Sequence, residues 1–171
     1  KILNNCEKKA CVLVGTNVLH AENIRSCMQK LDLEFTCISR SILYASNDLS
    51  SGKELKYWNF AVSFHCSLSH SNLIAKLKYI ERSCGRHRLG SLSHEVPIDL
   101  DLVFLLAESS LDSEVEYCMD YSFILKTSYF IGPLANLYPS WIHPDAEIDL
   151  SMTLKNIKEL SPRLEKISDV S

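Results

Sequence analysis

Short apolar runs alternate with amphipathic stretches along the first part of the chain. Residues 10–15 are apolar and end in glycine, a pattern typical of a buried strand. Apolar side chains then recur on one helical face, which predicts a helix over about 20–31, at Ile24, Met28 and Leu31. From Leu33 apolar and polar positions alternate as far as Tyr44, and this alternation predicts a second strand.

The period of two is cleanest between residues 58 and 68. One face of this segment is apolar and the other carries smaller or polar side chains, so it predicts a strand with one buried and one more polar face. The apolar set is Trp58, Phe60, Val62, Phe64, Cys66 and Leu68, and the opposite set is Asn59, Ala61, Ser63, His65 and Ser67. A helix over about 72–84 follows, with Ser69 or Ser71 as its cap and Gly85 as its end. Residues 98–104 return to the strand period.

The predicted order is therefore β-α-β-β-α-β, which indicates an α+β, ferredoxin-like sheet with both helices on one face. The other face is then open to ligands. Beyond residue 111 the pattern is weaker: 117–129 is compatible with strand pairing, 130–137 with a short helix interrupted by Pro133, and the tail over about 145–171 with one more amphipathic helix. The 171 residues fit a single domain with a core over about 10–139.

Composition narrows the class of protein. A hydrophobic fraction of 46% and a charged fraction of 23% are those of a globular chain, and a net charge of −3 excludes a general attraction to nucleic acid or to an anionic membrane. Seven scattered cysteines without a Cys-x-x-Cys pair indicate reduced thiols. No apolar run approaches the roughly 18 residues of a membrane span. We therefore expect a soluble cytoplasmic protein, monomeric by default.

Two acids stand out in the strand over 98–104. Asp99 and Asp101 lie two positions apart, so both carboxylates emerge from one strand face with Cα atoms roughly 7 Å apart. The other face carries apolar side chains, at Ile98, Leu100, Leu102 and Phe104. Such a pair can bind a hard cation such as Mg²⁺ and leave coordination positions for substrate phosphates. Taken alone, however, an Asp-x-Asp is more often a pair of solvated charges.

The loop before that strand supplies cations. Arg86 and Arg88 can grip phosphate oxygens in bidentate fashion, although alone they are equally typical of a solvated loop at a helix C-terminus. Carboxylates and arginines on neighbouring segments form the arrangement expected for magnesium-assisted phosphoryl transfer. In the strand over 58–68, Asn59 can hydrogen-bond a planar heterocycle. Tyr57 beside it can either stack on that ring or pack in the core.

Together these motifs resemble the 6-hydroxymethyl-7,8-dihydropterin pyrophosphokinase family over about residues 10–139. The resemblance is carried by Gly15-Thr16-Asn17, Tyr44-Ala45-Ser46, Tyr57-Trp58-Asn59, Ile80-Glu81, Gly85-Arg86-His87-Arg88, Ile98-Asp99-Leu100-Asp101-Leu102 and Pro133-Leu134 with Pro139. It implies an enzyme of folate biosynthesis that transfers pyrophosphate from ATP to the pterin hydroxymethyl group. Its partners would be these small molecules.

The resemblance also implies roles at the phosphates. Asp99 and Asp101 would bridge a pair of Mg²⁺ ions on the ATP phosphates, and both would be catalytic together with Arg86. Arg86 and Arg88 would hold the triphosphate, and Glu81 would lie beside the nucleotide. ATP and Mg²⁺ are thus the implied co-substrate and cofactor.

At the pterin, the resemblance implies that Asn59 forms hydrogen bonds to a ring stacked between Tyr57 and Tyr129. Tyr129 replaces the family's phenylalanine, and Ser46 stands at a threonine position that lines the same pocket.

The chain also departs from the family pattern. The family's Trp-x-Pro-Arg before the aspartates reads Ser93-His94-Glu95-Val96, its Pro-His reads Asp120-Tyr121, and its next arginine is Thr127. Three hypotheses follow: an active pterin pyrophosphokinase, a catalytically impaired paralogue that binds a pterin or nucleotide without efficient turnover, and an unrelated ferredoxin-like binding module. An RNA-binding module would need exposed aromatic side chains on its central strands, which the polar face of the strand over 58–68 does not offer.

Overall fold

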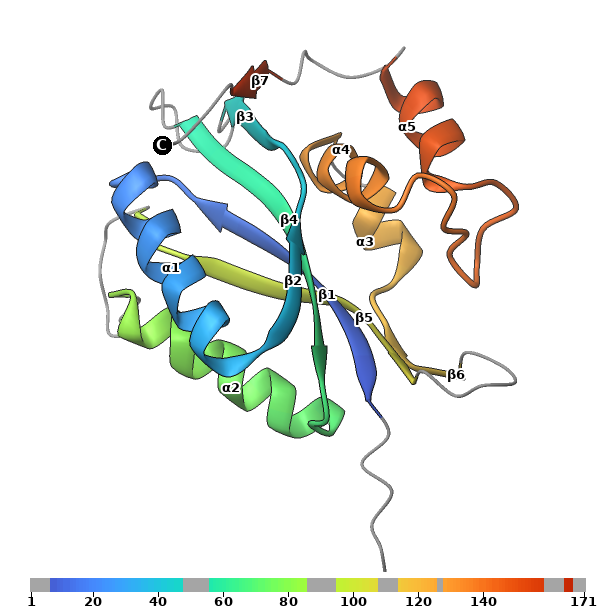
Figure 1. Ribbon diagram of the computed structural model, residues 1–171. Coiled ribbons are helices and arrows are strands. Elements are labelled where there is room, and N and C mark those ends of the chain that lie inside the picture. Colours follow the sequence, from blue (N-terminus) through green and yellow to red (C-terminus); the bar gives the residue numbers. More distant parts are fainter. Residues whose placement is uncertain are drawn as a thin grey trace, which may run out of the picture.

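The computed structural model describes residues 7–47, 56–85, 95–107, 114–125, 128–158 and 165–167, arranged as Figure 1 shows. The strands are β1 (Lys8–Thr16), β2 (Thr36–Arg40), β3 (Leu43–Asn47), β4 (Lys56–Cys66), β5 (Asp99–Ala107), β6 (Glu114–Cys118) and β7 (Glu165–Ile167). The helices are α1 (His20–Glu34), α2 (His70–Ser83), α3 (Tyr121–Leu125), α4 (Ser128–Leu137) and α5 (Leu150–Lys158).

These strands pair into one sheet, in which every pairing between described residues is antiparallel. The order is β6-β5-β1-β4-β3-β7, and β2 pairs with the part of β4 that β3 leaves open. β1 lies at the centre, between β4 and β5. The strands that the sequence predicted therefore lie in the order fourth, first, third, second, which confirms the α+β, ferredoxin-like arrangement.

Helices α1 and α2 cover one face of the sheet (Figure 1). Their apolar stripes pack against the apolar faces of β1, β4 and β5. The fully buried side chains of this core include Val12, Leu31, Phe64, Leu73, Leu77, Ile80 and Leu100. Phe35, at the end of α1, stacks on Phe64 with a ring-centroid distance of 4.0 Å. The apolar positions predicted for both helices and for β4 are confirmed here.

Helices α3, α4 and α5 cover most of the opposite face (Figure 1). They pack on a second core made of Cys11, Leu13, Ala61, Val103, Phe104, Ile124, Ile131, Leu134, Ala135 and Leu150. The prediction of an open second face is thus wrong over most of the sheet. The more polar face of β4 is buried too, with Asn59 and Ser63 only 6% and 4% exposed. α4 and α5 confirm the helices predicted around Pro133 and in the tail.

The predicted second strand needs correction. α1 runs to Glu34, so Leu33 belongs to its last turn and is 87% exposed. The strand itself is split into β2 and β3, which are separated by Ser41 and Ile42. Within β2, Cys37 adopts a positive φ of 53° and the pairing with β4 shifts register. At the break, the backbone N–H of Ser41 donates to Ala61 O, and Ser41 Oγ accepts from Ala61 N, both at 2.8 Å. One serine therefore holds both halves against β4.

A bulge in β5 also changes the predicted facing of one aromatic residue. The pairing with β1 skips Val103, and this extra residue turns Phe104 to the face covered by α3–α5. There its ring centroid lies 5.3 Å from that of Tyr138 and 5.1 Å from that of Trp141. The alternation predicted that Phe104 shares the face of Leu100, and this prediction is wrong. The strand pairing considered for 117–129 is confirmed only at its start, where Tyr117 and Cys118 of β6 pair with β5. Helix α3 follows from Tyr121, and α4 begins at Ser128.

Two further features bear on the class of protein. None of the helices among the described residues combines the length and the apolar character that crossing a bilayer requires. The described cysteines are all free thiols: Cys11, Cys27, Cys66 and Cys84 are buried, Cys118 is half-buried and Cys37 is exposed.

Candidate active site

A pocket of about 220 Å³ opens on the second face of the sheet, where β1 ends and β5 begins. It is lined by Leu13, Val14, Gly15, Tyr57, Asn59, Asp99, Asp101, Tyr129 and Phe130. The structure thus brings together residues that the sequence analysis singled out on three separate segments, namely β4, β5 and the first turn of α4. The helices α3–α5 that cover the rest of this face leave the aspartate end as a cavity.

Gly15 forms the floor between the two polar sides of this pocket. In the sheet it pairs with Asn59 of β4 on one side and with Asp99 of β5 on the other. A Cβ atom at this position would lie 3.0 Å from Asn59 Oδ1. The absence of a side chain at Gly15 therefore lets the amide of Asn59 and the carboxylate of Asp99 face one cavity across a single strand.

Asn59 is held from the side away from β1. Its Nδ2 donates to Ser46 Oγ of β3 at 3.3 Å. Tyr44, its direct partner in the β3–β4 ladder, is buried, and burial raises the pKa of the Tyr44 phenol, so this neighbour stays uncharged at neutral pH. Ser46 therefore lies behind Asn59 and bonds to it; it does not line the cavity itself. This contact orients the Asn59 amide.

Asp99 and Asp101 lie on the pocket face of β5, as their spacing predicted. Both are half-buried, and they stand opposite Gly15 and Leu13 in the ladder. No third histidine, cysteine or acid of the described segments joins them in a cluster that could hold a metal by itself. Two carboxylates suffice for Mg²⁺, which prefers oxygen ligands and usually keeps positions for water and substrate phosphates. The donor set therefore fits magnesium bound together with a phosphate substrate.

Aromatic rings form the remaining wall of the pocket. Tyr57 comes from the start of β4, and Tyr129 and Phe130 come from the first turn of α4. The rings of Tyr129 and Phe130 meet edge to face, with centroids 5.1 Å apart. The sequence analysis singled out Tyr57 and Tyr129 but missed Phe130, because the docking of α4 on the sheet is a tertiary feature. Two adjacent aromatic residues at a helix start were the only local signal.

Glu81, which was expected beside the nucleotide, lies in the interface between α2 and β5. Its side chain is 3% exposed. Its Oε1 accepts hydrogen bonds from the backbone N–H of Leu100 at 2.8 Å and from Lys78 Nζ at 2.7 Å. It does not line the pocket that holds Asp99 and Asp101. Its predicted contact with the nucleotide stays a prediction, as do those of Arg86 and Arg88, which lie outside the described residues.

Asn17 ties the end of β1 to the segment that leads into β5. Its Oδ1 accepts from Val96 N at 2.6 Å, and its own N–H donates to Val96 O at 3.1 Å. The Asn17 side chain is buried, with 3% exposed. These two bonds fix the backbone shortly before Asp99. The sequence analysis noted Asn17 only as part of the Gly15-Thr16-Asn17 motif, and nothing local revealed this long-range role.

Comparison with known proteins agrees with this geometry. Residues 11–139 match the profile of the family described as 7,8-dihydro-6-hydroxymethylpterin-pyrophosphokinase. The chain belongs to this family. It is also 26% identical over 140 residues to the 2-amino-4-hydroxy-6-hydroxymethyldihydropteridine pyrophosphokinase of Aquifex aeolicus (strain VF5), a match that covers 81% of each chain. The resemblance found in the motifs is therefore confirmed, and with it a pyrophosphokinase of folate biosynthesis whose co-substrate is ATP.

The structure describes two of the positions at which the sequence analysis expected a departure from the family motifs, Val96 and Tyr121. Val96 is half-buried and is the residue held by Asn17. The phenolic oxygen of Tyr121 lies 3.2 Å from Thr153 Oγ1 of α5, and its ring centroid lies 5.0 Å from that of His143. Thr153 and His143 both follow the stretch that the family profile matches. Tyr121 therefore contacts the C-terminal part that this chain adds to the matched region.

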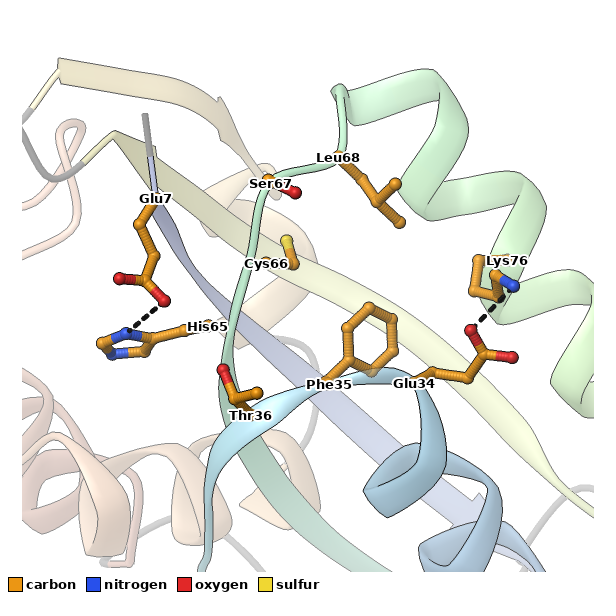
Figure 2. Close-up of a pocket in the computed structure, with 9 residues that line it drawn as sticks. All are labelled: Glu7, Glu34, Phe35, Thr36, His65, Cys66, Ser67, Leu68 and Lys76. Atoms are coloured by element: carbon orange, nitrogen blue, oxygen red, sulfur yellow. Dashed lines mark ion pairs between the residues drawn. The ribbon is translucent and has the colours of Figure 1, made fainter. Parts of the chain in front are cut away.

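A second cavity, of about 560 Å³, lies at the other end of β4 and is shown in Figure 2. Its walls include two ion pairs, Lys76–Glu34 at 2.8 Å and His65–Glu7 at 3.5 Å when His65 is protonated. None of the site residues that the sequence analysis predicted lines it. Its charged side chains pair with one another across the walls. In the 220 Å³ pocket, by contrast, Asp99 and Asp101 lie side by side on one strand.

Proposed function

We propose that this pyrophosphokinase transfers pyrophosphate from ATP to 6-hydroxymethyl-7,8-dihydropterin in the 220 Å³ pocket, and that the reaction requires Mg²⁺. The observation that carries the proposal is the convergence of Asn59, Tyr57 and Tyr129 with Asp99 and Asp101 around one cavity. One side of that cavity offers an amide and aromatic rings for a heterocycle. The other side offers carboxylates for a metal-bound phosphate chain.

The pterin is held by Asn59 and the aromatic wall. An amide presents two N–H donors and a carbonyl acceptor, which complements the amino and oxo groups of a pterin edge. Asn59 already gives one N–H to Ser46, so its orientation is set before substrate arrives. Tyr57 and Tyr129 supply ring faces for stacking on the flat bicycle. This arrangement leaves the hydroxymethyl group pointing toward the aspartate side.

The phosphates are held on the other side of the pocket. Asp99 and Asp101 provide the carboxylate ligands for Mg²⁺, which neutralises charge that builds up on the phosphate oxygens. Arg86 and Arg88, which precede β5 in the sequence, bind the triphosphate. The pterin hydroxyl loses its proton to water as its oxygen bonds to the β-phosphorus. The bond from that phosphorus to the oxygen shared with the α-phosphate breaks, and AMP leaves with the electron pair.

The replaced family positions bear on the rate. Where the family has an arginine, Val96 brings no cation to the phosphates, and where it has a histidine, Tyr121 turns toward Thr153. Loss of a preorganised cation commonly lowers the rate by about a hundredfold or more. We therefore propose slower turnover than in family members that keep both residues. The free thiols of the described cysteines support a reducing compartment such as the cytoplasm.

The test is the release of AMP from ATP, Mg²⁺ and 6-hydroxymethyl-7,8-dihydropterin by the wild-type chain. Asp99→Ala or Asp101→Ala is expected to abolish AMP release while the thermal unfolding temperature changes little, because both side chains are partly exposed at the pocket. Asp32→Ala is the matched control: it removes the same group from the exposed surface of α1 and leaves activity unchanged.

Calorimetric titration of the pterin, with and without a non-hydrolysable ATP analogue and Mg²⁺, separates the remaining possibilities. Binding together with AMP release supports the proposal. Binding without AMP release selects the impaired paralogue. If the chain neither binds the pterin nor releases AMP, the proposal is contradicted outright.

A further inference from the structure

Glu81 is a buried acid that the proposed reaction does not use directly. It lies on α2, on the side of the sheet opposite the pocket, and only 3% of it is exposed. One oxygen, Oε1, accepts both from Lys78 Nζ at 2.7 Å and from the backbone N–H of Leu100 at 2.8 Å. Leu100 is the residue between Asp99 and Asp101. A helix side chain therefore bonds to the backbone at the midpoint of the metal-binding pair.

The strand at this point has pairing on one side. Asp99 and Asp101 pair with Gly15 and Leu13 of β1. On the other side, the described pairing of β5 with β6 begins only at Phe104. The N–H of Leu100 goes to Glu81 instead of to a strand, so Glu81 takes the place of a ladder partner where the two aspartates project. Without that acceptor, this N–H would be a buried donor without its hydrogen bond.

Stability alone does not account for an acid at this place. Removing a carboxylate from water costs several kcal/mol unless the group is fully hydrogen-bonded, and replacing a buried ion pair by apolar side chains is often neutral or stabilising. The core around Glu81 is otherwise apolar, with Leu73, Leu77 and Ile80 on the same helix. The acid is therefore best explained by the particular group it bonds.

We propose that Glu81 is a positioning residue, which holds β5 through the Leu100 N–H so that Asp99 and Asp101 keep the spacing and direction that Mg²⁺ requires. This inference rests on the proposed function of the two aspartates. It assigns Glu81 an action through the backbone, in contrast to the direct nucleotide contact that the family resemblance implies. Groups that orient metal ligands in this way commonly contribute about tenfold to a hundredfold in metal affinity.

Two conservative variants of Glu81 distinguish the effect of its side-chain length from the effect of its charge. Glu81→Gln keeps a carbonyl oxygen at the same distance along the side chain and loses the charge. Glu81→Asp keeps the charge but is one methylene shorter and withdraws from the Leu100 N–H. Glu34→Gln is the matched control, because it alters another helix glutamate in a lysine ion pair, 2.8 Å from Lys76 and away from the pocket.

The first readout does not need activity. Hydrogen exchange of the Leu100 amide, followed by NMR, is expected to be at least about tenfold faster in Glu81→Asp and close to wild type in Glu81→Gln and Glu34→Gln. Calorimetric binding of Mg²⁺ with a non-hydrolysable ATP analogue is expected to weaken about tenfold in Glu81→Asp only. The pterin dissociation constant without Mg²⁺ should not change in any of the variants.

The second readout is the Mg²⁺ dependence of AMP formation. The Mg²⁺ concentration for half-maximal rate is expected to rise about tenfold in Glu81→Asp and to stay near wild type in Glu81→Gln. If Glu81→Gln is as impaired as Glu81→Asp while its Leu100 amide exchanges normally, the acid acts by charge on the nucleotide and the positioning role is overturned. Wild-type exchange and wild-type Mg²⁺ binding in Glu81→Asp overturn it as well.

Failure of the proposed function gives a different result. In that case the wild-type chain releases no AMP, while Leu100 exchange and Mg²⁺ binding still report on Glu81. Should Glu81→Asp unfold below the assay temperature, Glu81→Met, which fills the same space without an acceptor, supplies the comparison with Glu81→Gln.

Discussion

The two faces of the central sheet are built from the same three strands but differ in polarity. On the face under α1 and α2, side chains from β1, β4 and β5 join one apolar core. On the face under α3–α5, the same strands contribute an apolar core at one end and the polar pocket at the other. Successive residues of β5 alternate between these environments, so Leu100 and Leu102 are buried in the first core while Asp99 and Asp101 line the pocket.

The difference teaches where this fold tolerates polar chemistry. Apolar packing across the whole of one face and over one end of the other supplies the stability, so the remaining end can keep a cavity with two carboxylates and an amide. Glu81 is the exception on the closed face, and it bonds to the backbone that carries those carboxylates. Changes on the two faces should therefore separate into losses of activity and losses of stability.

Asp101 and Leu102 are neighbours in β5 but lie on opposite faces of the sheet, and the largest expected effect on the rate is at Asp101. Asp101→Asn should lower the rate of AMP formation on the order of a thousandfold, because a neutral amide is a poor ligand for Mg²⁺. Its thermal unfolding should stay close to that of wild type, since the side chain is partly exposed. Steady-state kinetics and thermal melts of the same preparation make the measurement. A variant that loses stability but keeps its rate would break the contrast between the faces.

Leu102→Ala should show the reverse pattern. Leu102 is 3% exposed in the core under α1 and α2, and a truncation of this kind typically lowers the free energy of unfolding by about 2–5 kcal/mol. Denaturant unfolding monitored by tryptophan fluorescence measures this loss. Below the unfolding transition, the rate per folded molecule should remain within about threefold of wild type. The space left by the Leu102 side chain lies under α1 and α2, on the face opposite the pocket, so the pocket carboxylates stay in place.

A smaller effect is expected at the pocket floor. In Gly15→Ala the new methyl group would lie 3.0 Å from Asn59 Oδ1, so the amide must shift by a few tenths of an ångström. A misaligned hydrogen bond of about 1 kcal/mol would weaken pterin binding about fivefold. Calorimetric titration of the pterin measures the change, and unaltered affinity would show that Asn59 does not contact the ligand. Val12→Ala, at a buried position of β1 that does not line the pocket, serves as the control for loss of stability alone.

Much of this architecture could be predicted from periodicity. The alternation along β4 and the helical stripes of α2 are local patterns that tertiary contacts reinforce, so their apolar positions were right. The strand interruption at Ser41 and the bulge at Val103 could not be predicted, because each depends on hydrogen bonds with a strand that is distant in sequence. A single inserted residue then reversed the facing of Phe104.

The candidate site divides in a similar way. Asp99, Asp101 and Asn59 were identified because their residue types and spacing within one strand carry chemical meaning. The hydrogen bonds from Asn17 to Val96 and from Leu100 to Glu81 were missed, since a buried hydrogen bond across about 20 or more positions leaves no local pattern. Phe130 was missed because it reaches the pocket only through the docking of α4 on the sheet. Glu81 was noticed through the family resemblance, and the structure alone shows the backbone group it bonds.

The smallest effect on AMP formation is expected from modification of the cysteine thiols that do not line the pocket. Burial, with a smaller contribution from Asp145, raises the pKa of the Cys118 thiol to about 11, and burial raises the pKa of Cys11 and Cys27 still further. The thiolate is the reactive form, so at pH 8 only about a thousandth of Cys118 is ionised. Iodoacetamide should therefore label the exposed Cys37 at least about tenfold faster than Cys118, as peptide mass spectrometry would show.

The rate at Cys118 should rise about tenfold for each pH unit below its pKa, because the thiolate fraction rises in that proportion. Labelling of Cys37 should leave AMP formation unchanged, since Cys37 is exposed on β2 and does not line the pocket. Loss of activity in step with Cys37 labelling would mean that β2 communicates with the pocket through β4. That result would show that the two ends of the sheet are not independent, because β2 pairs with β4 away from Asn59.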